Sequence, residues 1–446
     1  MSGRKVRIGD FLKRVKEPVK IIAQDEYTLV TIRMYHKGVV KRATVKGSSI
    51  KSSTLYSIKT NQFILSGIDA RNAAFGIVPN ELNGAVVTND FWSHDINTNI
   101  IDLHYFYWLT TTSHFNEACI KASEGTTNRQ RLQADKFYEF EVYLPHIEEQ
   151  KELVKRFGFI KNKLQVLNDE LNNQQSYLQL LRQTILQEAV QGKLTKRDEE
   201  DESASELLKR IKAEKQKLVR EGKLKKEKEL PPIADGEIPF ELPKGWVWCR
   251  VGEVISLISG QHIEAHDYNE VGVGVPYLTG PSDFGDLKPV FTRWTEKPKV
   301  FAQKDDILIT VKGSGVGKLN LLHEDNVAIG RQLMAIRTVL IKRDFVKLFL
   351  ASIYDKLQDQ KSGIAIPGIS REDILEKAFP LPPMNTQLQI IAKVEQLLQY
   401  INNLEQHIFN NQIQSQQLLQ AVLKEAFEGT DKVHEENEIL TIAAEA

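Results

Sequence analysis

The chain has 446 residues, enough for two or three domains that each bury a core of their own. Its 59 lysine and arginine residues balance 59 aspartate and glutamate residues, so net charge favours no class of partner. Two cysteines are too few for a disulfide framework, the N-terminus is charged, and no apolar run approaches a membrane span; these features predict a soluble cytoplasmic protein.

Residues 1–144 form the first predicted globular domain, and its positive charge is concentrated in one segment. From Tyr27 to Ile68 there is no aspartate or glutamate, whereas basic, hydroxyl and aromatic residues alternate. This mixture suits contact with a phosphate backbone and the bases beside it, although a solvated lysine-rich surface has the same composition. The candidate binding residues here are Arg33, Tyr35, Lys37, Arg42, Lys46, Ser48 and Lys51.

Residues 145–192 contain a predicted long helix, which from about Glu149 to Gln191 would extend ~65 Å at the usual rise per residue. Its apolar stripe advances in steps of four and three residues, the spacing of a coiled-coil seam. The stripe consists of Leu153, Phe157, Ile160, Leu164, Leu167 and Leu171. A helix with one apolar stripe needs a partner helix.

Residues 193–240 are expected to be a charged linker. A helix is predicted from about Ser205 to Arg220 with a thin apolar stripe, and prolines follow at 231, 232 and 239. Prolines at this position indicate entry into a second domain.

Residues 241–381 form the second predicted globular domain, with a glycine-rich loop from Lys312 to Lys318. The loop resembles a nucleotide-binding loop, but Lys312 stands where the first glycine is required and Leu319 where serine or threonine is required. It is better interpreted as a hairpin tip; such a tip lets backbone approach DNA closely, though most are merely turns. The candidate binding residues are Lys312, Ser314, Lys318, Arg331 and Gln332.

Residues 382–430 predict a second long helix, followed by an acidic tail over 431–446. Its stripe has the register of the first helix and consists of Ile390, Val394, Leu397, Ile401, Leu404 and Ile408. The Leu-Pro pair that precedes each helix, Leu144-Pro145 and Leu381-Pro382, recurs 237 residues apart. The two stripes can therefore pair within one chain.

The duplication extends into the globular domains at a different offset. Arg7 to Asp10 resembles Arg250 to Glu253, 243 residues further on, and the same offset places Phe63 on Asp306. The helices have thus kept their length while the domains have diverged, as in repeated structural units. The next position of each stripe is polar, Gln174 and Asn411, and such residues either specify helix register or lie at the surface.

Catalytic motifs are missing from the sequence. His262 and His266 flank a glutamate that lies one place too late for a zinc-protease helix, and no methyltransferase loop, phosphate loop or nuclease pair is present. The sequence therefore predicts a protein without an active site or metal site of its own.

Several segments together resemble the specificity subunits of type I restriction-modification enzymes. They are Leu242 to Trp246 at the start of a domain, Asp306 to Thr310, Ala328 to Gln332, the Leu-Pro pair with Gln150 or Gln387 at each long helix, and the helix ends near Gly192 and Gly429. The similarity covers essentially the whole chain, but the first domain lacks the Leu-Pro-x-Gly-Trp segment.

The resemblance implies an α+β fold with two mixed α/β target-recognition domains. Two long helices forming an intramolecular antiparallel coiled coil would join them. Each domain would recognise one half of a bipartite, asymmetric site in double-stranded DNA. Two adenine methyltransferase subunits and the restriction subunits would assemble with this non-catalytic chain, in a system that serves phage defence. S-adenosylmethionine, ATP and magnesium are then expected on the partner subunits and no cofactor on this one.

Two other interpretations remain open. A coiled-coil scaffold with two protein-binding heads would bind no DNA, and salt-sensitive DNA binding distinguishes it from a recognition subunit. An unrecognised nuclease or methyltransferase would act on DNA when the chain alone receives magnesium and S-adenosylmethionine.

Overall fold

The computed structural model describes residues 3–52, 54–125, 130–196, 201–285, 288–313, 315–353 and 368–445, with backbone only from residue 428 onwards. The chain divides into two compact units, each of which combines a globular head with parts of two long helices. The first unit is Met1–Asn172 with Phe409–Ala446, and the second is Asn173–Ile408. None of the described helices is long and apolar enough to span a membrane.

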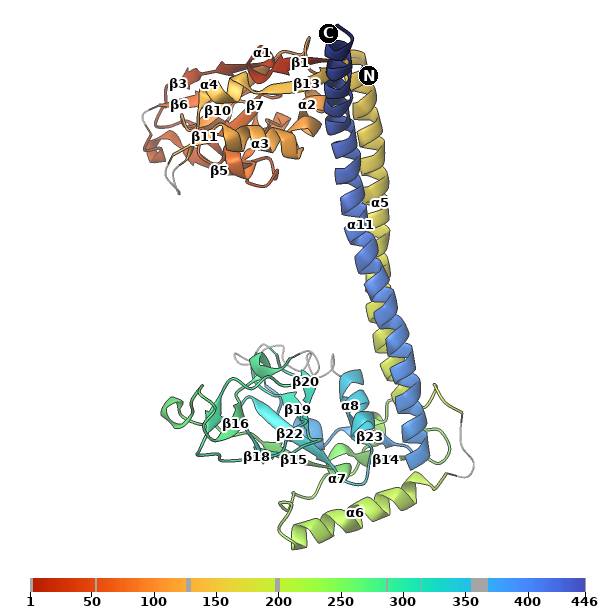
Figure 1. Ribbon diagram of the computed structural model, residues 1–446. Helices are drawn as coiled ribbons and strands as arrows, with labels where there is room; N and C mark the ends of the chain where they lie inside the picture. The colour runs from red at the N-terminus through yellow and green to blue at the C-terminus, as the bar shows by residue number, and fades with distance from the viewer. Residues whose placement is uncertain are drawn as a thin grey trace. The chain divides into compact units, whose positions relative to one another are not determined.

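The first head runs from β1 to β13 and contains two main sheets (Figure 1). One sheet has the order β2-β10-β7-β8, the other the order β3-β6-β9-β4-β5, and β1 pairs antiparallel with β13. Its strands are β1 (Gly3–Arg7), β2 (Leu12–Val15), β3 (Glu17–Val19), β4 (Glu26–Ile32), β5 (Val39–Lys46), β6 (Leu55–Ser57), β7 (Phe63–Ser66), β8 (Phe75–Ile77), β9 (Val86–Val87), β10 (Phe91–Ile96), β11 (Ser123–Glu124), β12 (Arg131–Leu132) and β13 (Glu141–Pro145). Its helices are α1 (Ile8–Phe11), α2 (Leu103–Thr110), α3 (Ser113–Lys121) and α4 (Ala134–Glu139).

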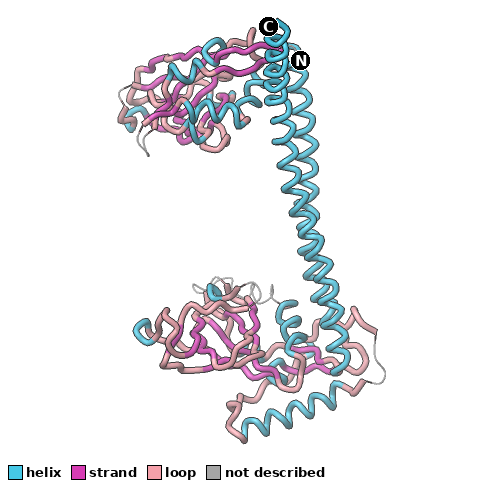
Figure 2. Tube along the Cα trace, in the orientation of Figure 1, coloured by secondary structure: helices cyan, strands magenta, loops and turns pink. Residues whose placement is uncertain are grey.

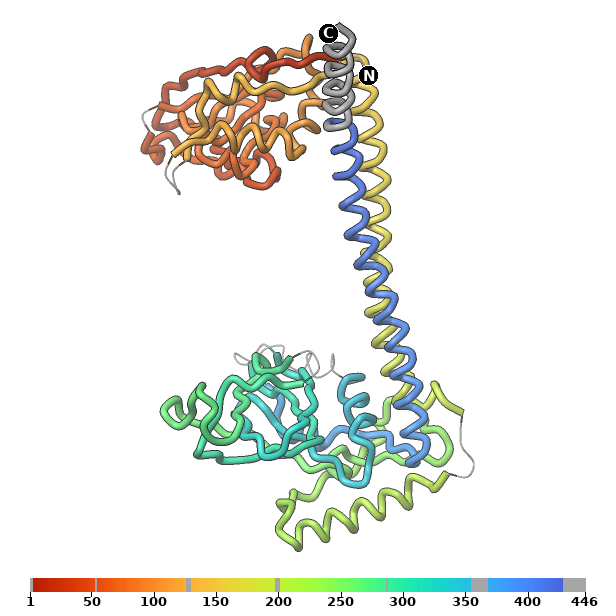
Figure 3. The backbone as a smooth tube through the Cα atoms, in the orientation of Figure 1, coloured from red at the N-terminus to blue at the C-terminus, as the bar shows by residue number. Residues whose placement is uncertain are grey.

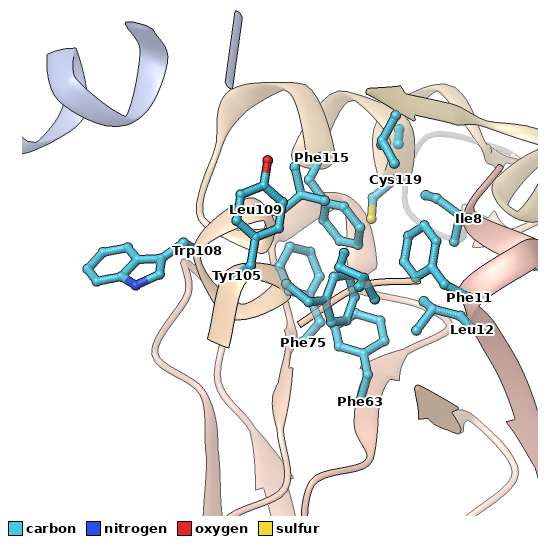
Figure 4. Close-up of a cluster of buried hydrophobic side chains, with 14 of the residues drawn as sticks. Ile8, Phe11, Leu12, Phe63, Phe75, Tyr105, Trp108, Leu109, Phe115 and Cys119 are labelled. Atoms are coloured by element: carbon cyan, nitrogen blue, oxygen red, sulfur yellow. The ribbon is translucent and has the colours of Figure 1, made fainter. Parts of the chain in front are cut away.

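Aromatic side chains from strands and helices form the core of the first head (Figure 4). Phe63 of β7 meets Phe106 of α2 edge-to-face at 5.0 Å, and Phe75 of β8 meets Phe115 of α3 at 5.3 Å. Such pairs stabilise a fold by ~0.5–1.5 kcal/mol each beyond the area that they bury. The helices are thereby held against the sheet β2-β10-β7-β8.

The second head runs from β14 to β23 and repeats this plan. Its sheets have the orders β15-β22-β19-β20 and β17-β16-β21-β18, and β14 pairs antiparallel with β23. Its strands are β14 (Val247–Arg250), β15 (Ile255–Ser259), β16 (Val275–Leu278), β17 (Trp294–Thr295), β18 (Phe301–Ala302), β19 (Ile307–Thr310), β20 (Leu319–Leu321), β21 (Val327–Ile329), β22 (Leu333–Thr338) and β23 (Ala378–Leu381). Its helices are α7 (Val251–Val254), α8 (Arg343–Ser352) and α10 (Glu372–Leu375).

Matching polar pairs correct the predicted alignment of the two heads by one residue. The Gln62 side chain donates to Asp95 in the first head, and the Arg337 guanidinium donates to Asp306 in the second. Gln62, not Phe63, is therefore the counterpart of Asp306. Since a one-residue slip in a strand moves every side chain to the opposite face, the predicted pairing would have placed an apolar ring where a carboxylate lies.

The two long helices are α5 (Ile147–Val190) and α11 (Met384–Glu445). Figure 2 draws them as helices, and Figure 3 colours α11 as far as residue 427. In the first unit Phe157 of α5 stacks on Phe427 of α11 at 5.7 Å, and Asn172 accepts from Gln412 at 3.1 Å. As α5 advances, its partner on α11 recedes, so the helices are antiparallel there. In the second unit Arg182 of α5 pairs with Glu405 of α11 at 3.1 Å.

The predicted seam agrees with the burial of most of its residues but fails at one corresponding position in each helix. Buried seam residues are Leu153, Phe157, Leu171, Ile390, Val394, Ile401 and Ile408, while Ile160, Leu164 and Leu397 are half-buried. Leu167 and Leu404 are 43% and 49% exposed, so their assignment to the seam was wrong.

An additional step of four residues explains the failure. After Leu164 the less exposed positions are Asn168 and Leu171, and after Ile401 they are Glu405 and Ile408. A straight helix drifts by ~20° per heptad from a strict seven-residue repeat, and an inserted step of four resets the phase. Downstream, Gln174 and Asn411 are exposed, which agrees with the alternative that they lie at the surface.

One buried glutamine ties each long helix to the head that precedes it. Gln150 is fully buried, donates to the Pro145 carbonyl at 2.9 Å and accepts from the Asp102 N–H, which precedes α2, at 2.8 Å. Gln387 donates in the same way to Pro382 at 3.0 Å and accepts from Lys342, which precedes α8, at 2.9 Å. The Leu-Pro plus Gln segments of the sequence are thus joints between head and helix.

The linker segment contains α6 (Ala204–Arg220), which packs against the second head. Leu207 and Ile211 of α6 are buried. After α6, Arg250 of β14 donates to the carbonyls of Pro231 and Pro232 at 2.9 and 2.7 Å. Much of the predicted linker is therefore attached to one surface of the second head.

Candidate nucleic-acid interface

The acid-free stretch of the first head forms the long hairpin of β4 and β5 and the segments that follow it. All seven predicted binding residues are exposed there. The described ion pairs of this stretch involve Lys59, which binds Glu17, and none involves Arg33, Lys37, Arg42, Lys46 or Lys51. Exposed cations without a carboxylate partner remain available to phosphate groups.

The hairpin tip holds three of these residues, Arg33, Tyr35 and Lys37. Two backbone hydrogen bonds fix the tip on the β7–β8 connection, from Tyr35 to the Asn72 carbonyl at 2.8 Å and from His36 to the Ala73 carbonyl at 3.2 Å. Tyr35 adopts a left-handed backbone, with φ 61°, and its side chain is 68% exposed. The tip therefore presents an aromatic ring and two cations on a supported backbone.

His36 does not add to the charge of the tip at neutral pH. Its ring packs edge-to-face on Phe75 at 5.4 Å, and this partial burial lowers the pKa of His36. The desolvated imidazole stays neutral. Positive charge at the tip comes from Arg33 and Lys37.

Lys46, Ser48 and Lys51 lie at the other end of the hairpin. Their segment is held by backbone bonds from Gly47 to Asp25 at 2.8 Å and from Ser48 to Ala23 at 3.0 Å. A strand of the length of β5 separates the ends by ~26 Å, and Arg42 lies between them beside a β-bulge. The structure thus divides the predicted set into two clusters.

In the second head, four of the five predicted residues come together where β19 ends and where β20 and β22 begin. We call this end of the sheet β15-β22-β19-β20 the sheet edge. Ser314 lies outside the described residues. The Val311 N–H donates to the Gln332 carbonyl at 2.8 Å, which places Lys312 beside Arg331 and Gln332. The Thr310 N–H donates to the Lys318 carbonyl at 2.9 Å. Lys312, Lys318, Arg331 and Gln332 are all exposed, and none of the described ion pairs involves these three cations.

Glycines allow the loops at this edge to approach one another. A Cβ on Gly280 would lie 2.0 Å from the Gln332 side-chain oxygen, and one on Gly315 would lie 2.8 Å from Pro281. Gly317 has a positive φ of 86°. The glycine-rich loop is the predicted hairpin turn. Close packing on Pro281 explains Gly315, and a positive φ explains Gly313 and Gly317.

The same edge exists in the first head and was missed by the sequence analysis. The Gly67 N–H donates to the Asp90 carbonyl at 2.7 Å, and the Leu132 N–H donates to the Gly67 carbonyl at 2.8 Å. In the second head the equivalent bonds run from Val311 to the Gln332 carbonyl and from Ile369 to the Val311 carbonyl. Here Arg131 pairs with Asp90 at 2.9 Å, with both side chains exposed. A repeat alignment with the corrected strand register would have identified these two residues.

The two cysteines are buried in the head cores, and burial raises the pKa of both thiols. Neither thiol is therefore an accessible nucleophile. Across the residues with a described structure, no group of histidine, cysteine, aspartate or glutamate side chains has an arrangement that could hold a metal ion.

A duplicated α+β head, each copy followed by a long helix and each carrying unpaired cations on exposed loops, defines a two-headed class of protein with a helical scaffold. A family described as "Type I restriction modification DNA specificity domain" matches residues 4–177 and 243–415. These segments make up more than half of the chain, and the chain belongs to this family.

Curated relatives carry the same description. The chain is 33% identical over 251 residues to the specificity subunit of the type I restriction enzyme EcoAI of Escherichia coli, which covers 53% of this chain and 42% of that protein. It is 34% identical over 276 residues to the EcoEI specificity subunit of the same species, with 58% and 46% covered. These alignments span about half the length of the relatives.

Solved structures share the fold. The HsdS subunit from Thermoanaerobacter tengcongensis matches with a TM-score of 0.59 at 22% identity, over 96% of this chain and 97% of that chain. A chain from a structure on complex assembly and conformational transition of the type I R-M system matches with a TM-score of 0.70 at 22% identity, over 95% and 97%. The two-headed α+β architecture predicted from the sequence is confirmed.

Proposed function

We propose that this chain is the DNA sequence-recognition subunit of a type I restriction-modification system. Each head recognises one half of a bipartite, asymmetric site, and the chain positions two adenine methyltransferase subunits together with restriction subunits. It contributes no catalytic group; S-adenosylmethionine, ATP and magnesium belong to the partners. The observation that carries the proposal is the equivalent sheet edge on the two heads. The second head carries exposed cations there that none of the described ion pairs involves, and the first head carries the exposed pair of Arg131 and Asp90.

The chemistry at the second edge suits recognition of base pairs. Arg331 can donate two hydrogen bonds to guanine, and Gln332 can form two with adenine, each discriminating by ~1–3 kcal/mol. Lys312 and Lys318 instead suit phosphates, which position the protein without carrying sequence information. In the first head Tyr35, Arg33 and Lys37 at the hairpin tip provide similar groups.

The long helices supply a surface for partner subunits. Apolar side chains that the seam does not bury include Phe159, Val166 and Leu418 in the first unit and Leu180 and Tyr400 in the second, all more than half exposed. Apolar residues in such positions are typical of docking surfaces. We assign this surface to the methyltransferase subunits.

Coexpression with the cognate methyltransferase subunit, followed by mapping of methylated adenines in the host genome, tests the proposal. The wild-type complex should methylate one asymmetric bipartite motif. Arg331→Ala and Gln332→Ala should relax only one half of that motif, whereas Lys318→Ala should reduce methylation and its salt dependence without changing the motif. A complex that methylates no defined motif, or DNA binding that is insensitive to salt, would reject the proposal in favour of a protein-binding scaffold.

A further inference from the structure

The surface of the second head that holds α6 has a bare counterpart on the first head. In the second head the Lys215 ammonium of α6 donates to the carbonyls of Gly252 and Ile255, each at 2.5 Å, at the end of α7. Lys212 of α6 pairs with Glu253 at 2.6 Å. We call the surface formed by α7 and the start of β15 the second seat.

The corresponding surface of the first head, formed by α1 and the start of β2, is called the first seat. Both short helices have the same capping bond, from Arg7 to Asp10 at 3.0 Å and from Arg250 to Glu253 at 2.7 Å. The strand that follows is the edge strand of its sheet in each head. Gly9, Asp10 and Leu12 are therefore the counterparts of Gly252, Glu253 and Ile255.

The two seats differ in the burial of their short helices but not in that of the strand residue, since Leu12 and Ile255 are 2% and 0% exposed. Gly252 is buried, and a Cβ on it would lie 2.8 Å from Leu230 of the linker segment. Gly9 and Asp10 are exposed, although a Cβ on Gly9 would lie 3.1 Å from Tyr138. Along the described parts of the chain, no lysine or arginine side chain donates to the carbonyls of Gly9 or Leu12. A groove of about 600 Å³ lies there, lined by Gly9 to Arg14, Asp95 to Asn97 and Tyr138.

We propose that the first seat binds a basic amphipathic helix of the α6 type from another protein chain. The required chemistry follows from the occupant of the second seat. The helix needs two apolar residues four positions apart, like Leu207 and Ile211 of α6. It also needs two lysines that follow the second apolar residue by one and four positions, like Lys212 and Lys215. The first lysine meets the Asp10 carboxylate, and the second meets the exposed Gly9 carbonyl. This inference stands independently of DNA recognition by the heads.

A labelled peptide of residues 203–221 provides the probe, titrated into the full-length protein and followed by fluorescence anisotropy. We expect saturable binding of one peptide per chain, because the chain's own α6 is tethered beside the second seat and outcompetes a free peptide there. A peptide with Lys215→Met should bind at least tenfold more weakly, since bonds from a charged group are lost.

The variant Asp10→Asn locates the binding, because asparagine can still accept the capping bond from Arg7. Asp10→Asn should reduce the affinity for the wild-type peptide several-fold. It should not further reduce the affinity for a peptide with Lys212→Met. The matched variant Glu253→Gln in the second seat should leave peptide affinity unchanged. Absence of saturable binding, equal affinity of the Lys215→Met peptide, or an effect of Glu253→Gln equal to that of Asp10→Asn would each overturn the proposal.

Discussion

The two heads share one sheet almost residue for residue and differ in the other. The strand order β2-β10-β7-β8 of the first head matches the order β15-β22-β19-β20 of the second. The glutamine joints at Gln150 and Gln387 also match. In the second sheet, β4 and β5 of the first head form a hairpin of seven- and eight-residue strands, whereas β16 and β17 have four and two residues. The sheet that shares a core with the long helix in the first head is preserved, and the other sheet has been free to change.

In the first head the comparison separates attachment to the long helix from the proposed recognition of DNA by the hairpin, whereas in the second head the proposed residues lie at one edge of the preserved sheet. Residues at the joint are buried and satisfy one another's hydrogen bonds, so substitutions there are costly. Residues on the hairpin are exposed, and substitutions there cost little stability. Duplication followed by divergence therefore alters the exposed loops first.

The largest expected effect comes from removing the second half. A fragment ending at Leu194 keeps one head and one helix, and two copies should pair antiparallel because an exposed seam is costly in water. The counterpart of Phe427 in the first repeat is Val190, so Phe157 should pack on Val190 of the second copy. With the methyltransferase subunit, this dimer should methylate an inverted repeat of the first half-site. Sequencing of methylated adenines decides the matter; persistence of the asymmetric motif contradicts it.

The glutamine joints should respond alike in the two heads. Gln387→Leu leaves the partly buried Lys342 N–H and the buried Pro382 carbonyl unpaired and should cost ~3 kcal/mol or more of unfolding free energy. Gln150→Leu should cost slightly more, since Gln150 also donates to the Ile100 carbonyl at 3.1 Å. Thermal unfolding measures both changes, with the exposed Gln396→Leu as a control. A marked difference in the opposite order would show that the joints are not equivalent.

Acid should destabilise the first head before the second. Burial lowers the pKa of His94 to about 4 from its usual 6.5, while its Nε2 lies 2.9 Å from the Tyr138 hydroxyl. Between pH 6.5 and 4 the His94 imidazole is therefore protonated in the unfolded chain but neutral in the folded head. The free energy of unfolding falls as the pH drops through this range, by roughly 3 kcal/mol in all. The counterpart of His94 is Ile336, which does not titrate.

Native-state hydrogen exchange at pH 7 and pH 5 tests this difference, with β7 and β10 compared against β19 and β22. His94→Ile combined with Tyr138→Leu reproduces the residues of the second head and should remove the pH dependence. Equal loss of protection in both heads at pH 5 would refute the role of His94.

The smallest change in stability is expected at the corrected seam positions. Leu404→Lys should alter the unfolding free energy by less than ~0.5 kcal/mol because Leu404 is about half exposed, whereas Ile408→Lys should cost several kcal/mol. If the exposed helix faces bind the methyltransferase subunit, Leu404→Lys should weaken that complex without lowering the melting temperature. A large loss of thermal stability in Leu404→Lys would restore Leu404 to the seam.

The sequence by itself determined the duplication, the two long helices and the repeated Leu-Pro and Gln segments, because each of these is a short pattern or its repetition. Steps of four and three residues specify an apolar helix face, and the repeated Leu-Pro and Gln segments recur at a constant distance. The acid-free hairpin was also apparent as a local composition. Such features are visible in short segments and in their repetition along the chain, so no knowledge of the packing was required.

Tertiary structure alone decided which distant residues meet. Asp90 and Arg131 lie 41 residues apart and come together only because β12 returns to the loop that begins at Gly67. Which residues form the seam after Leu164 depends on how the two helices wind around each other. A strict seven-residue repeat in the sequence cannot reveal this winding. The binding of α6 likewise depends on the backbone carbonyls of Gly252 and Ile255. Every residue has a carbonyl group, so only the folded structure shows which carbonyls can accept a hydrogen bond from Lys215.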